Sequence, residues 1–132
     1  MERCKRVLMV EDSPHDAELF AHYLSRACAG TGLERVEYAD DLRAALGRGS
    51  WDLIVLDANV LGFGVRDMLQ VLREEDVASP VIVLTGDVHA LLDETMRTAL
   101  AGIAVYSKND FVVAVEAVRK LLVDKPGGMS AG

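Results

Sequence analysis

Residues 7–14, VLMVEDSP, decide the fold class of this chain. An apolar run ends in two carboxylates, and Ser13 and Pro14 follow with the residue types preferred at a helix N-cap and a first helical position. Apolar residues then recur at helical spacing from Ala17 to Cys28, which places one apolar stripe along a helix. A short buried strand that leads straight into a helix is the first part of a strand–helix–strand unit.

The same alternation continues along the chain and predicts an α/β fold around a parallel sheet. The runs at 7–10, 53–56 and 81–84 are apolar on both faces and are expected in the centre of the sheet, whereas the run at 35–39 alternates and is expected at an edge. The strands are predicted at 7–10, 35–39, 53–56, 81–84 and 103–106. The helices are predicted around the apolar positions of 17–28, 42–46, 65–72, 92–100 and 111–122.

Length and composition favour one domain with a single sheet. The chain has 132 residues, of which 51% are hydrophobic, and 14 Lys and Arg against 21 Asp and Glu give a net charge of −7. Such a chain lacks the clustered cations that bind nucleic-acid phosphates, and its first apolar run is too short for a signal peptide or a membrane span. We therefore expect a cytoplasmic protein that binds neither nucleic acid nor membrane. The domain is predicted over residues 1–123, and 124–132, which has no apolar period, is predicted as a flexible tail or linker stub.

Polar residues stand where the predicted strands end. Glu11 and Asp12 follow the first strand, Asp57 the third and Thr85 the fourth, and Lys108 lies just after the fifth. In an open parallel sheet these ends meet at one edge, where ligands bind. Three carboxylates crowded together do not all stay ionised without a cation between them. Because the donors are oxygen atoms, we predict Mg²⁺ or Mn²⁺ rather than zinc.

This set of residues resembles that of the CheY-like receiver domains of response regulators in two-component signalling. The acidic pair, the acceptor Asp57, the hydroxyl of Thr85 and Lys108 stand in the family's order, and the resemblance covers nearly the whole chain. Residues 11–16, EDSPHD, are similar to the opening of many stand-alone and kinase-attached receivers. The resemblance implies a flavodoxin-like, doubly wound (βα)5 fold with a five-stranded parallel sheet of order 2-1-3-4-5. It also implies phosphoryl transfer to Asp57 from a sensor histidine kinase or a phosphotransfer protein.

The resemblance also implies how a metal ion is held. Asp12 and Asp57 are expected to bind Mg²⁺ or Mn²⁺ directly, Glu11 through a water molecule, and Asn59 through its backbone carbonyl. A carboxylate in direct contact contributes more Coulomb energy than one that acts through water. Asp12 is therefore expected to matter more for metal affinity than Glu11.

The remaining roles concern the phosphoryl group. Asp57 is expected to attack phosphorus as a nucleophile, and the Lys108 ammonium and the Thr85 hydroxyl to bind phosphoryl oxygens. Gly86, next to Thr85, leaves space for the group to enter. We expect Lys108 to gain a strong partner only when the phosphoryl group arrives, and its removal to leave the stability of the unphosphorylated protein almost unchanged.

Two residues flank the path by which water attacks the aspartyl phosphate. They are Asn59, two residues after the acceptor, and Asp87, two residues after the hydroxyl. An amide and a carboxylate can orient a water molecule through hydrogen bonds. The pair is similar to that of fast-resetting chemotaxis-type receivers, so we predict a short-lived phosphoryl group and a rapid response or a phosphate sink.

The sequence departs from the family pattern at three places. Leu61 and Asn109 stand where the family usually has proline, which leaves the first loop without a fixed φ and makes a cis bond after Lys108 unfavourable. The aromatic switch residue normally lies three residues before the lysine, but Val105 is there and Tyr106 follows it. Either a bulge returns Tyr106 to that face of the strand, or signalling uses no aromatic rotor. We favour the second.

Other functions are less consistent with these residues. A pseudo-receiver that only binds partners stays open because of the departures in the loops. A phosphohydrolase of the haloacid-dehalogenase type needs an acid two residues after its nucleophile, where Asn59 stands, and a flavin site needs a phosphate-binding loop after the first strand. We expect a signalling domain rather than a turnover enzyme. Its downstream partner is expected on the fourth helix, fifth strand and fifth helix, or on the first helix, and homodimerisation stays open.

Overall fold

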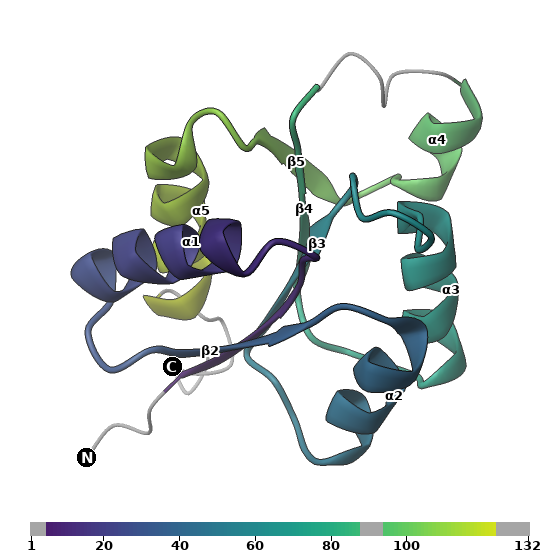
Figure 1. The fold of residues 1–132 in the computed structure, drawn as a ribbon, viewed down its shortest axis with the longest axis horizontal. Coiled ribbons are helices and arrows are strands. Elements are labelled where there is room, and N and C mark those ends of the chain that lie inside the picture. Colours follow the sequence, from purple (N-terminus) through teal and green to yellow (C-terminus); the bar gives the residue numbers. More distant parts are fainter. Residues whose placement is uncertain (1–4, 88–93, 124–132) are drawn as a thin grey trace, which may run out of the picture.

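The computed structural model describes residues 5–87 and 94–123. Its strands form one parallel five-stranded sheet in the order β2-β1-β3-β4-β5 (Figure 1). This is the predicted doubly wound arrangement, with the wholly buried strand β3 in the middle of the sheet. The strands are β1 (Arg6–Val10), β2 (Gly32–Val36), β3 (Leu53–Asp57), β4 (Val81–Thr85) and β5 (Ala104–Ser107).

Helices cover both faces of the sheet. Helices α1 and α5 lie on one face, and α2, α3 and α4 lie on the other (Figure 1). None of the helices in the described ranges is long and apolar enough to span a membrane. The helices are α1 (Pro14–Ala27), α2 (Ala39–Gly47), α3 (Val65–Glu74), α4 (Glu94–Ala99) and α5 (Phe111–Val123).

Each face of the sheet has its own apolar core. Successive strand residues point to opposite faces, so Leu8 packs on the side of α2 and α3 while Val7 packs on the side of α1 and α5. The rings of Phe20 in α1 and Phe111 in α5 meet edge to face with centroids 5.3 Å apart. This contact helps to hold the start of α5 beside α1, close to the carboxyl ends of the strands.

The amino-terminal ends of the strands are closed by Trp51. Its indole Nε1 donates a hydrogen bond to the carbonyl of Ala45 in α2 (3.1 Å), as expected for a ring packed near the second helix. The guanidinium of Arg6 lies 4.2 Å from the ring centroid. Trp51 is 6% exposed, so this end of the sheet is shielded from water.

The helix caps follow the predicted chemistry. Ser13 is the N-cap of α1 and its hydroxyl accepts the backbone N–H of Asp16 (3.2 Å), with Pro14 in the first turn. At the start of α5 the carboxylate of Asp110 accepts the N–H of Val113 (3.4 Å).

Some predicted boundaries were wrong. Strand β2 runs over 32–36 rather than 35–39, because it pairs residue by residue with β1, from Arg6 and Gly32 to Val10 and Val36. Glycine is more typical of turns than of strands, so the sequence did not indicate that β2 begins at Gly32. The predicted start of the fourth helix at 92 and the predicted tail at 124–132 lie outside the described residues.

Candidate functional site

The carboxyl ends of the strands bring the predicted residues together. Glu11 directly follows β1, Asp57 is the last residue of β3, Thr85 is the last residue of β4, and Lys108 directly follows β5. Because the strands are parallel, these ends lie at the same edge of the sheet. Residues that are far apart along the chain are thereby brought together in one compact site.

Three carboxylates form the centre of the site. One oxygen from each of Glu11, Asp12 and Asp57 lies within 4.8 Å of the other two. Glu11 is fully buried and Asp57 is 1% exposed. The backbone N–H of Asn59 donates to Asp57 Oδ1 (2.9 Å) and orients it. Such a set of oxygen donors fits a hard divalent cation, Mg²⁺ or Mn²⁺.

Lys108 is bonded to three carboxylates. Its Nζ lies 3.0 Å from Glu11 Oε1, 2.9 Å from Asp16 Oδ2 and 3.1 Å from Asp57 Oδ2. Burial by itself lowers the pKa of Lys108, but the hydrogen bonds to Asp16, Glu11 and Asp57 outweigh it and raise the pKa above its ordinary value. The ammonium is therefore charged at every physiological pH.

This arrangement corrects one expectation. Lys108 does not wait for a phosphoryl group to gain strong partners, because carboxylates from three different elements already surround it. Two of those carboxylates, on Glu11 and Asp57, are buried. Lys108 is consequently a structural counter-ion of the site before any phosphoryl group is present.

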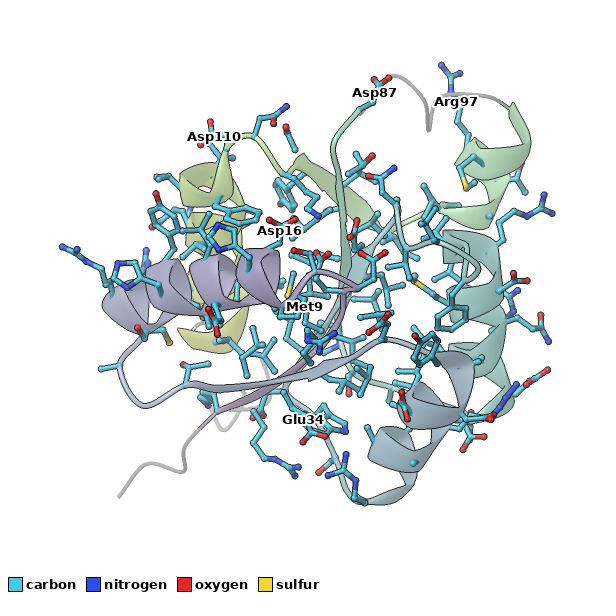
Figure 2. The ribbon with its side chains drawn as sticks, viewed as in Figure 1. Met9, Asp16, Glu34, Asp87, Arg97 and Asp110 are labelled. Carbon is cyan, nitrogen blue, oxygen red and sulfur yellow. The ribbon has the colours of Figure 1, made fainter. Side chains whose placement is uncertain are left out.

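Asp16 is the functional-site residue that sequence reasoning missed. It lies in the first turn of α1, where an acidic residue is explained by the helix dipole alone. One signal was available, because Asp16 lies in the first turn of the helix that begins directly after the acidic pair, close to the carboxyl end of β1. Figure 2 shows Asp16 at the end of α1 that lies over the strand ends.

The buried Glu11 carboxyl is a weaker acid than an ordinary glutamate side chain. Burial, followed by the hydrogen bond and charge of Asp57, raises the pKa of Glu11 to about 7, although Lys108 and the N–H of Ser13 oppose the shift. The N–H of Ser13 donates to Glu11 Oε2 (3.1 Å). The carboxyl therefore takes up a proton near neutrality, and a divalent cation competes with that proton.

The other side of Asp57 is formed by the end of β4 and the loop after β3. The side-chain oxygen of Asn59 accepts the backbone N–H of Gly86 (2.9 Å) and lies 3.5 Å from the Thr85 hydroxyl. That hydroxyl accepts the N–H of Asp87 (3.1 Å). Asn59 thus places its side-chain amide at the site.

The two positions without proline both use their backbone N–H. The N–H of Leu61 donates to Asp12 Oδ2 (3.3 Å), and the N–H of Asn109 donates to the hydroxyl of Ser107 (3.0 Å). Proline has no N–H and cannot make either bond. In this chain the departures from the family pattern add hydrogen bonds at the site, and Leu61 itself is 86% exposed.

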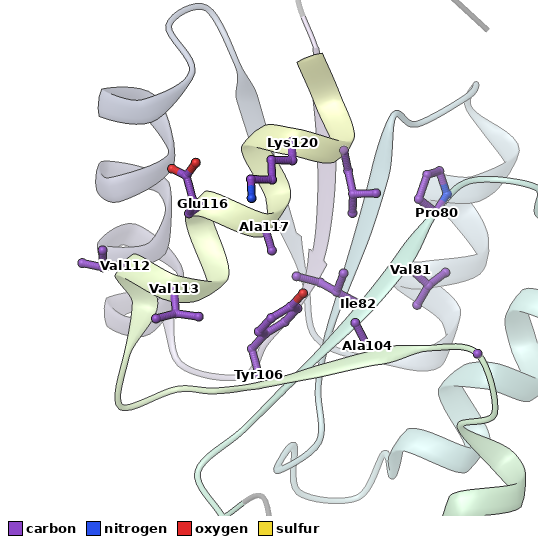
Figure 3. Close-up of a pocket in the computed structure, with 12 residues that line it drawn as sticks. Pro80, Val81, Ile82, Ala104, Tyr106, Val112, Val113, Glu116, Ala117 and Lys120 are labelled. Carbon is purple, nitrogen blue, oxygen red and sulfur yellow. The ribbon is translucent and has the colours of Figure 1, made fainter. Parts of the chain in front are cut away.

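Val105 and Tyr106 occupy opposite faces of β5. The strands β4 and β5 pair in step, with Leu84 opposite Tyr106 and Thr85 opposite Ser107, so no bulge intervenes. Val105 packs with the core under α3 and α4. Tyr106 lies on the α5 side, in a groove with Ile82 (Figure 3). The face toward α4 therefore carries a valine and no aromatic ring.

Solved structures identify the fold. No protein-family model matches the sequence, and no curated sequence is significantly similar to it. The signal receiver domain of a signal transduction histidine kinase from Syntrophus aciditrophicus is 28% identical, with a TM-score of 0.71 over 92% of each chain. The response regulator TrrA from Thermotoga maritima, solved in complex with Mg²⁺ and BeF, is 25% identical, with a TM-score of 0.71 over 89% of this chain and 99% of that one.

A third neighbour extends the likeness along the chain. The signal receiver domain of an HD domain-containing protein from Pseudomonas fluorescens is 20% identical, with a TM-score of 0.75 over 95% of this chain and 99% of that one. These neighbours are CheY-like receiver domains. The chain has the receiver fold, and the resemblance found in its sequence is confirmed.

Proposed function

We propose that this chain is a phosphoacceptor receiver domain of a two-component system, with Asp57 as the residue that is phosphorylated. The observation that carries the proposal is the convergence on one buried carboxylate, Asp57, of two further carboxylates and an ammonium. Phosphoryl transfer needs little covalent chemistry from a protein and depends mainly on positioning and charge neutralisation. The site supplies both.

In the proposed reaction, an oxygen of Asp57 attacks the phosphorus of a phosphohistidine. An oxygen–phosphorus bond forms, the phosphorus–nitrogen bond breaks, and the electron pair of that bond leaves with the imidazole nitrogen. The N–H of Asn59 donates to Asp57 Oδ1, which leaves Oδ2 on the side where Lys108 binds. The acceptor is therefore oriented before a donor arrives.

Asp12, Asp57 and the backbone carbonyl of Asn59 would hold Mg²⁺ or Mn²⁺ directly, and Glu11 would hold it through water. The cation would neutralise charge on the transferred group. Leu61 orients Asp12 through its N–H, and Ser13 orients Glu11 in the same way. The chain thus supplies a second layer of backbone donors behind its carboxylates.

Lys108 and Thr85 are proposed to bind the phosphoryl oxygens. Lys108 Nζ is 3.1 Å from Asp57 Oδ2, so its charge already lies beside the acceptor. The Thr85 hydroxyl is buried at the end of β4 and Gly86 next to it has no side chain to block entry. Thr85 would exchange its contacts with the Asp87 carbonyl (3.2 Å) and the Asn59 side chain (3.5 Å) for a phosphoryl oxygen.

We infer that the donor is a sensor histidine kinase or a phosphotransfer protein. Support comes from the similarity to the receiver domain of a histidine kinase from Syntrophus aciditrophicus. The domain would pass its signal by binding a protein partner, not by turning over a substrate. Because Val105 replaces an aromatic residue on the α4 side, α1 is the surface that we favour for that partner over α4, β5 and α5.

The test is mass spectrometry after incubation with Mg²⁺ and acetyl phosphate. Wild type is expected to gain one phosphoryl mass, and Asp57→Asn to gain none. Asp52→Asn is a matched control, since Asp52 is a buried acid that binds the Arg6 N–H at the far end of the sheet. Wild type without added mass would instead support a pseudo-receiver.

A further inference from the structure

Lys108 has more anionic partners than the proposed reaction uses. An ammonium has three N–H donors, and the carboxylates of Glu11, Asp16 and Asp57 lie within 3.1 Å of Nζ. Glu11 and Asp57 belong to the cluster that could hold a metal ion, but Asp16 does not. Asp16 therefore contacts the Lys108 ammonium from outside the three-carboxylate cluster.

We propose that Asp16 competes with the phosphoryl group for the Lys108 ammonium and so lowers the extent to which Asp57 is phosphorylated. This inference rests on the proposed function. Asp16 acts through Lys108 and touches neither the metal cluster nor the acceptor. It is a positioning residue that determines how strongly the Lys108 ammonium interacts with the phosphoryl oxygens.

The start of α1 keeps the Asp16 carboxylate in place. The backbone N–H of Asp16 is bonded to the Ser13 hydroxyl in the N-cap, so its main chain is fixed. Its carboxylate is 36% exposed, whereas those of Glu11 and Asp57 are buried. When a cation and a phosphoryl group engage Glu11 and Asp57, Asp16 is the partner that stays with Lys108.

The charges decide the direction of the effect. Three carboxylates, those of Glu11, Asp16 and Asp57, contact a single ammonium, and Asp12 lies beside two of them. A phosphoryl group brings further negative charge. Before the phosphoryl group arrives, Lys108 is also held by Glu11 and Asp57, so it keeps two carboxylate partners when Asp16 is lost. Removing the Asp16 charge leaves more of the ammonium's charge for the phosphoryl oxygens.

The experiment uses Asp16→Asn, which keeps an acceptor oxygen but removes the charge. We expect the half-saturating concentration of acetyl phosphate to fall about threefold to tenfold, with the maximal rate and the Mg²⁺ affinity changed by less than about twofold. Beryllofluoride in Mg²⁺ is expected to bind more tightly by a similar factor. Asp16→Glu keeps the charge and is expected to behave as wild type.

Glu18→Gln is the matched control. Glu18 is an exposed acid on the same helix, and the substitution makes the same change in net charge. It is expected to leave both measurements unchanged, because a charge outside the site is screened by salt. An equal gain in Glu18→Gln would mean that net charge alone is responsible, and the proposal would be wrong.

The remaining outcomes separate this inference from the proposed function. If wild type is phosphorylated but Asp16→Asn needs the same or a higher concentration of acetyl phosphate, the role of Asp16 is overturned. The proposed function then still stands. Phosphoryl mass on Asp57→Asn overturns the proposed function, and beryllofluoride binding then decides the role of Asp16. If no variant takes up either group, both proposals are wrong.

Discussion

The two sides of Asp57 differ in how firmly the chain holds them. The acidic half is made of Glu11, Asp12, Asp57 and Lys108, and ion pairs join its lysine to the buried carboxylates of Glu11 and Asp57. The hydroxyl half, made of Asn59, Thr85, Gly86 and Asp87, is held by a few neutral hydrogen bonds, and three of its four residues are exposed. The acidic half is built before any ligand binds, and the hydroxyl half has room to rearrange.

The largest effect that this comparison predicts is on stability. Lys108→Ala leaves the buried carboxylates of Glu11 and Asp57 without their cation, so the free energy of unfolding without Mg²⁺ is expected to fall by about 2 kcal/mol. Saturating Mg²⁺ should recover most of that loss. Urea denaturation measures both values. Lys120→Ala, which removes an exposed lysine of α5, is the control. Equal stability of the two variants would show that ion pairs do not hold the acidic half more firmly than the hydroxyl half.

Metal affinity tests whether Asp12 and Glu11 play different roles in the acidic half. Asp12→Asn removes a direct ligand and is expected to weaken Mg²⁺ binding about tenfold or more, by the charge lost at contact distance. Glu11→Gln removes a carboxylate that acts through water, so a loss of only about threefold is expected. Isothermal titration calorimetry gives both constants. Equal losses would contradict the division of roles between the two residues.

The pH dependence of stability tests the burial of the Glu11 carboxyl in the acidic half. The pKa of Glu11 is raised from 4.5 to about 7, so the folded protein holds a proton that the unfolded chain has already released. Stability without metal should therefore be highest below pH 4.5 as far as this group is concerned, and fall as the pH rises through about 7. Thermal unfolding from about pH 5 to about pH 8, the range in which the stability of most proteins is highest, measures this fall. Glu11→Gln should flatten this part of the profile.

The smallest expected effect concerns the hydroxyl half. Asn59 and Asp87 are predicted to orient the water that hydrolyses the aspartyl phosphate, so Asn59→Met and Asp87→Leu should each lengthen its lifetime, by about threefold to tenfold. The decay of phosphorylated protein after removal of the donor measures this. Decay that is unchanged or faster in both variants would show that neither residue orients water.

The sequence predicted the parts of the site that depend on where strands end. Glu11, Asp57 and Thr85 were found because a buried strand fixes the direction of the residues that follow it. The opposite faces of Val105 and Tyr106 followed from alternation along β5. Both inferences use geometry that is local to a strand and needs no knowledge of packing.

Contacts between elements could not be predicted in this way. The pairing of Asp16 with Lys108 joins residues 92 positions apart, and it depends on how α1 is placed over the sheet. The same is true of the Leu61 N–H, which reaches Asp12 only because the loop after β3 folds back toward β1. The expectation that Lys108 gains strong partners only with the phosphoryl group was wrong for this reason, since the carboxylates around it come from the end of β1, from α1 and from β3.

Trp51 gives the protein an optical probe that is separate from its chemistry. It is the only tryptophan in the chain, and its ring lies against Arg6 and α2 at the start of β3. The acceptor Asp57 lies at the other end of that strand, roughly 13 Å from its first residue, Leu53, at about 3.3 Å per residue. Emission from the indole should therefore follow unfolding and ignore the occupancy of the site, so the two equilibria can be monitored independently in one sample.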